Sequence, residues 1–171
     1  MQRTMSSEEL SKYINQIENP SETFKLFLRH YVTGDILIRG RNEEDISVWD
    51  KLKGNELEIA KQIIMNELRI IPDFSYIRAV SIFKDERAIP ILISLIETLP
   101  YSGTNNCLGE RLLAAKALHD LTGYKDYVPM LETACKSPDD SLHSYFKYSI
   151  YQFIVGLSET DKARIMKALE R

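Results

Sequence analysis

The sequence has few of the residues that stabilise small secreted domains or form all-β folds. It contains two cysteines, Cys107 and Cys135, among 171 residues, and their spacing fits neither a metal site nor a disulfide framework. Glycine and proline are also scarce, with seven and six residues, which disfavours an all-β domain with many tight turns. We therefore expect an all-α protein whose thiols stay reduced, as is typical of the cytoplasm.

Long apolar segments and a strong charge of one sign are lacking too. The longest strongly apolar stretch, residues 88–96, is too short to span a bilayer, and residues 1–10 have no apolar signal-peptide core. The formal net charge is −3, and the densest basic segment is only residues 39–41. Proteins that bind nucleic acid usually show a basic excess. The sequence thus predicts a cytoplasmic protein with no membrane partner, and it disfavours nucleic acid.

Recognisable catalytic and metal-binding motifs are absent from the sequence. It contains no Gly-x-Ser-x-Gly, no phosphate-binding glycine loop and no His-Glu-x-x-His. His119 and Asp120 with a cysteine resemble a thiol catalyst, but both fall on the polar side of a predicted helix, and Cys135 falls among apolar positions. Residues 139–140 are explained by a helix start. We therefore predict a non-enzymatic protein without cofactor or metal.

Two similar blocks occupy the middle of the chain. An apolar helix pattern at residues 77–83 leads through a short polar turn into residues 87–92, where a proline stands near the start. Residues 115–121 lead through a slightly longer turn into residues 126–131, with a proline in the corresponding place. Proline is well tolerated in the first turn of a helix. The duplicated block predicts stacked helical hairpins.

Apolar periodicity extends this pairing along the chain. The second helices begin near residues 55, 87, 126 and 159, a regular period that is typical of repeat proteins. We predict a single helical-repeat domain over residues 1–171, with a helical cap at 1–41 and four helix pairs at 42–171. Residues 100–109 are predicted to be the longest loop. Predicted helix starts lie at Ser6 (with Glu9), Ser21, Asp73 and Ser158.

The two blocks resemble HEAT-like repeats, of the short kind also seen in bilin-lyase-type HEAT proteins. The resemblance rests on the motif Ala79-Val80-x-x-Phe83 before residues 85–92, and on Ala114-x-x-Ala117-Leu118 before residues 126–131. It is best over residues 74–136. The resemblance implies an all-α superhelix of stacked antiparallel helical hairpins, with about four repeats following the N-terminal helices.

A stack of this kind presents an extended concave surface that suits peptides and proteins. If the second helix of each pair lines that surface, polar residues that interrupt its apolar stripe face the groove. Glu97, Glu132 and Lys136 are such positions. We therefore predict that they contact a partner.

Aromatic residues supply a second set of candidates. Five of the nine tyrosines fall within residues 124–151. Tyr145, Tyr148 and Tyr151 are predicted beside the core stripe of one helix, where they would suit protein recognition, because tyrosine offers amphipathic contact area at low entropic cost. Trp49, the single tryptophan, is predicted to pack in the core.

Together these features favour a protein–protein interaction module, such as an adaptor, an inhibitor or an immunity-type protein, whose partner is another protein or a peptide. Two alternatives remain. One is a nucleic-acid-binding or DNA-repair HEAT-like protein, which would need a continuous basic stripe along the concave face. The other is a bilin-lyase-like chaperone, which would need an apolar cleft with a few convergent polar groups.

Overall fold

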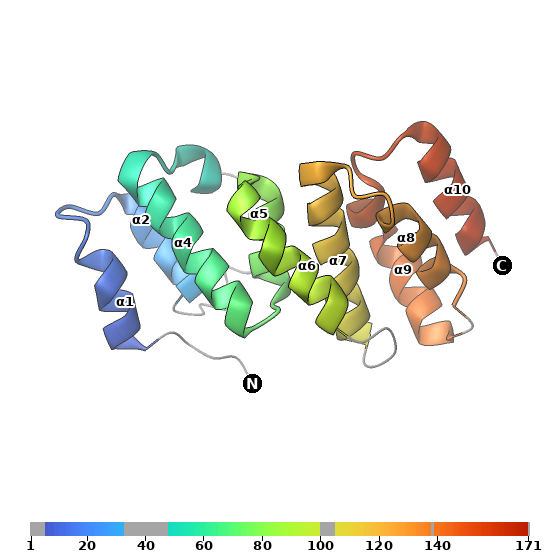
Figure 1. Cartoon of the computed structure of the whole chain (residues 1–171), viewed down its shortest axis with the longest axis horizontal. Helices are drawn as coiled ribbons and strands as arrows, with labels where there is room; N and C mark the ends of the chain where they lie inside the picture. The colour runs from blue at the N-terminus through green and yellow to red at the C-terminus, as the bar shows by residue number, and fades with distance from the viewer. Residues whose placement is uncertain (1–5, 33–47, 100–104, 138, 171) are drawn as a thin grey trace. The chain divides into compact units, whose positions relative to one another are not determined.

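The computed structural model describes residues 6–32, 48–99, 105–137 and 139–170 (Figure 1). Over these residues all the regular secondary structure is helical, which confirms the all-α prediction. The basic segment at 39–41 lies outside them. In the described part of the chain, no helix has the length and apolarity that a bilayer span requires.

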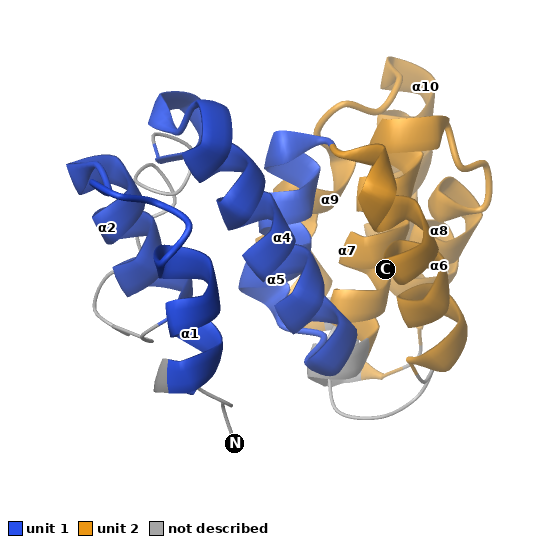
Figure 2. Ribbon diagram, turned by 60° about the vertical axis from the view of Figure 1, so that its left-hand side comes forward, with its two compact units in different colours: residues 1–84 blue, residues 85–171 orange. Residues whose placement is uncertain are grey.

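The chain divides into two compact units, Met1–Lys84 and Asp85–Arg171 (Figure 2). The single domain over residues 1–171 that the sequence predicts stays a prediction. The first unit contains α1 (Ser7–Ile14), α2 (Glu22–Phe27) and the π-helical turn η1 (Leu28–Val32). A helical turn at 48–51 precedes α4 (Gly54–Ile70) and α5 (Phe74–Phe83).

Side-chain caps begin α1, α2 and α5 as predicted, whereas α4 starts without one. Ser6 and Glu9 form a reciprocal capping box at α1, and the Ser21 hydroxyl accepts the backbone N–H of Phe24 at the start of α2. Asp73 caps α5. A cap satisfies N–H groups that have no partner within the helix, so these starts follow from local sequence.

The core of the first unit is built around an aromatic cluster. Trp49 is buried and donates its indole N–H to the Tyr31 hydroxyl at 3.1 Å. Its ring lies 5.5 Å from that of Phe27 and 4.9 Å from that of Phe83. The prediction that Trp49 packs in the core is therefore confirmed. Helix α4 packs against α2 and α5, and it contributes a buried aliphatic face that includes Ile59, Ile63, Ile64 and Leu68.

The second unit contains five α-helices among its described residues. A 3-10 turn, η2 (Glu86–Ala88), leads into α6 (Ile89–Thr98), which has Pro90 in its first turn. The remaining helices are α7 (Asn105–Thr122), α8 (Tyr127–Cys135), α9 (Asp140–Ile154) and α10 (Glu159–Leu169). Helix α7 packs against α6, α8 and α9, and α10 packs against α8 and α9. The second helices predicted to begin near residues 126 and 159 are thus present as α8 and α10, and each packs against the helix that precedes it.

The predicted loop at 100–109 is wrong over its second half, because α7 already begins at Asn105. Asparagine and glycine have low helix propensity, and this suggested a loop. Packing overrides that propensity here, since Leu108 and Gly109 are buried. A Cβ atom placed on Gly109 would lie 3.1 Å from the Tyr145 hydroxyl of α9, so the glycine allows α7 and α9 to approach closely.

Candidate functional site

The six residues predicted to bind a partner all lie in the second unit, in three different settings. Glu97 belongs to α6, Glu132 is in α8 with Lys136 at its end, and the three tyrosines are in α9. The six side chains differ in their ion pairs, in their hydrogen bonds and in how far they are buried.

Glu132 and Lys136 belong to an ion-pair network between two helices. The Lys136 ammonium lies 2.5 Å from one Glu132 oxygen, and the Arg164 guanidinium of α10 contacts the other. Hydrogen bonds from Lys136, and then from Arg164, lower the pKa of Glu132 below its ordinary value. The carboxylate is therefore engaged by two cations of its own chain and helps to join α8 to α10.

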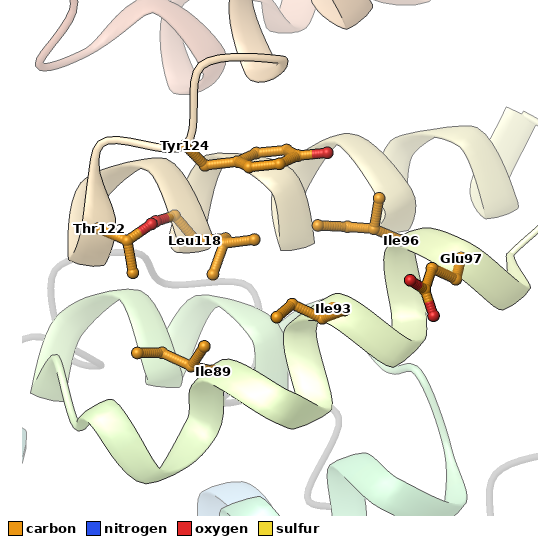
Figure 3. Close-up of a pocket in the computed structure, with 7 residues that line it drawn as sticks. All are labelled: Ile89, Ile93, Ile96, Glu97, Leu118, Thr122 and Tyr124. Atoms are coloured by element: carbon orange, nitrogen blue, oxygen red, sulfur yellow. The ribbon is translucent and has the colours of Figure 1, made fainter.

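Glu97 stands at the edge of an apolar pocket between α6 and α7. The pocket has a volume of about 330 Å³. Helix α6 contributes residues spaced at i, i+4, i+7 and i+8, which share one face. Figure 3 shows these side chains around a common space, with the Glu97 carboxylate at one end. The lining residues are Ile89, Ile93, Ile96, Glu97, Leu118, Thr122 and Tyr124.

The polar groups around this pocket differ in their hydrogen bonds and ion pairs. The Thr122 hydroxyl donates to the Leu118 carbonyl at 2.7 Å. The ring nitrogen Nδ1 of His119 lies 3.0 Å from the Tyr124 carbonyl oxygen and holds the segment that carries the Tyr124 ring. Glu97 is exposed and forms no ion pair with any other residue that the structure describes. Among the lining residues that the structure describes, it is the one that carries a charge.

Tyr145 is a packing residue between α9 and α7. It is half-buried, and its ring lies 5.3 Å from that of Phe146 and 6.5 Å from that of Phe153. Burial raises the pKa of its phenol. The close approach to Gly109 adds to this contact, so Tyr145 offers little free surface.

Tyr148 and Tyr151 project into solvent. They are 86% and 72% exposed, and Val155, which follows α9, is 62% exposed. These are the three most exposed large apolar side chains in the described residues. Their i, i+3, i+7 spacing places them along one side of α9 and the turn that follows. We refer to Tyr148, Tyr151 and Val155 as the α9 stripe; sequence analysis missed Val155, although its spacing from both tyrosines matches the helix.

Cys135 does not have the electrostatics that a thiol catalyst needs. Cys135 is buried, and burial raises the pKa of its thiol to about 12, with a smaller contribution from Glu132. A cysteine nucleophile reacts as the thiolate, whereas this thiol stays protonated at neutral pH. The prediction that Cys135 fills the core is confirmed. The side chain of Cys107 lies outside the described residues.

Within the described segments, no group of three or more His, Cys, Asp or Glu residues is arranged to hold a metal ion.

Comparison of the chain with protein-family models, with curated proteins and with solved structures found no match.

Proposed function

We propose that the protein is a non-enzymatic HEAT-like repeat protein that binds another protein or a peptide through the α9 stripe. The observation that carries the proposal is the exposure of Tyr148 and Tyr151 on one side of a single helix. Large apolar side chains that gather on a surface mark interaction sites more often than isolated ones do. Tyrosine is also among the residues that contribute most to binding at the centres of interfaces.

The architectural part of the proposal is supported by packing within the second unit. Helix α7 contacts α9, and α8 contacts α10, so each helix of one pair lies beside its counterpart in the next. This is the neighbour relation that stacked repeats require. The duplicated blocks at residues 77–92 and 115–131 in the sequence support the same arrangement.

The burial of Trp49 weighs against the DNA-repair alternative. Such a protein would need an accessible aromatic ring to stack on a base, and Trp49 is enclosed by Phe27, Tyr31 and Phe83. Tyrosines that stand free on a helix suit a protein surface better. We therefore retain protein binding as the proposed function.

The proposal is tested by removing the two rings together. The Y148A/Y151A variant, compared with the wild type as bait in lysate of the presumed host, should recover the bound protein at least about tenfold less well, the loss expected when hot-spot aromatics are truncated. Both residues are exposed and alanine favours helix, so the helical circular dichroism should be unchanged. Quantitative mass spectrometry after nuclease treatment provides the measurement.

Ile70→Ala is the matched control, because Ile70 is half exposed on α4 in the other unit. It should recover the partner as the wild type does. Equal recovery by the tyrosine variant and the wild type would contradict the proposal. So would recovery of nucleic acid alone from a sample left without nuclease, released by raising the salt concentration.

A further inference from the structure

The pocket between α6 and α7 is a second feature of the same unit, and it is independent of the α9 stripe. Its walls are the aliphatic side chains of Ile89, Ile93, Ile96 and Leu118 together with the Tyr124 ring (Figure 3). Ile93 remains 41% exposed. A concave apolar surface that stays open to water gains free energy when an apolar group covers it.

The helix packing accounts for this opening. In the second unit α8 packs extensively on α10. Among the described residues, α6 packs extensively on α7 but not on α8. Space is therefore left beside α7 at the point where Tyr124 leads into α8. The contact between His119 and the Tyr124 carbonyl fixes one wall, so the pocket is formed before any ligand arrives. Preformed sites bind more tightly, because less ordering is needed.

The charge of the lining selects the kind of ligand. Among the described lining residues, Glu97 carries the single charge, and no described residue forms an ion pair with it. A cation beside it would gain a charge-assisted hydrogen bond. An anion would instead meet the repulsion of the carboxylate.

The size of the pocket limits the ligand. About 330 Å³ is near the lower end of the range of roughly 300–1,000 Å³ for small-molecule sites. We propose that this pocket binds a small amphiphilic cation, with an apolar body of roughly six to eight carbon atoms and one ammonium group. The apolar body lies against the isoleucines and Leu118, and the ammonium group pairs with Glu97.

The probe for this proposal is hexylammonium, with hexanoate and hexanol as chain-matched ligands of opposite and zero charge. Each is titrated into the full-length protein carrying ¹³C-labelled isoleucine methyl groups. Hexylammonium should shift the methyl resonances of Ile89, Ile93 and Ile96 in a saturable manner. It should bind about tenfold more tightly than hexanoate, as one charge-assisted hydrogen bond implies.

Glu97→Gln separates the charge from the shape of the site. Glu97 is exposed, so the substitution should leave the fold intact. It should reduce the preference for hexylammonium over hexanoate to within about twofold, while hexanol binding stays the same. Met166→Ala, an exposed position on α10, is the control and should change neither.

Two results would overturn the proposal: no saturable shift of the three methyl groups with hexylammonium, or equal affinities of the wild type for hexylammonium and hexanoate. The first result would show that the pocket does not bind hexylammonium, and the second that it does not select a positive charge. Neither depends on the α9 stripe, so the pocket can fail while the proposed protein interaction stands, and the reverse also holds.

Discussion

Tyr127 is the largest fully buried side chain in the described residues, and its hydroxyl donates to the Phe153 carbonyl of α9 at 2.5 Å. Replacing it with phenylalanine removes this bond and leaves most of the packing in place. We expect Tyr127→Phe to lower the free energy of unfolding by about 1 kcal/mol at pH 7. Urea denaturation of both proteins measures the difference. Tyr148→Phe, at an exposed position on α9, is the matched control and should be neutral.

Tyr127 also predicts a pH dependence. Burial, and to a smaller extent the charge of Asp120, raises the pKa of its phenol above the ordinary value near 10. A raised pKa contributes stability that is complete below the unfolded value and is lost as the pH rises above it. The wild type should therefore lose stability more steeply above pH 10 than Tyr127→Phe. Parallel slopes from pH 8 to 11 would contradict this assignment.

At the scale of helices, Gly109 and Tyr145 couple α7 to α9. A methyl group on Gly109 would lie 3.1 Å from the Tyr145 hydroxyl, which is tighter than ordinary van der Waals contact. Alanine also favours helix by about 1 kcal/mol over glycine. We expect Gly109→Ala to be at least about 1 kcal/mol more favourable in a Tyr145→Phe background than in the wild type. A double-mutant cycle of unfolding free energies measures this coupling, and additivity would contradict it.

The same pair of helices shows where prediction from sequence ends. The starts of α1, α2, α5 and α10 were predicted correctly, because a cap joins a side chain to a backbone N–H within three residues. The start of α7 was not, since it depends on burial of Leu108 and Gly109 and on Tyr145, which is distant in sequence. Local propensity alone favoured a loop there.

The candidate site also contains features that one helix determines and features that depend on contacts between helices. Exposure of Tyr148 and Tyr151 followed from helical periodicity, because their position beside the core stripe is a property of one helix. The ion pair of Glu132 with Arg164 depends on how α10 packs against α8. Likewise, the residues that face Glu97 across the pocket come from α7 and the turn after it. Contacts between helices need the packing geometry, which one sequence does not supply.

At the scale of the whole molecule, the two compact units raise the question of whether the chain unfolds as one body. Ile63 of α4 and Leu112 of α7 are fully buried, one in each unit. Replacing either with alanine should cost roughly 2–5 kcal/mol, because it removes buried methyl groups and leaves a cavity. In the repeat architecture proposed above, neighbouring elements make most of the stabilising contacts, so an unfolding event can stay local.

We therefore expect each substitution to reduce amide protection chiefly within its own unit. Hydrogen exchange followed by mass spectrometry should show faster exchange in α4 and α5 for Ile63→Ala, and faster exchange in α7 to α9 for Leu112→Ala. Ile63→Val, which removes a single methyl group, should give the same pattern with a smaller amplitude. A uniform loss of protection over both units in either alanine variant would instead favour one cooperative domain, because then neither core could open alone.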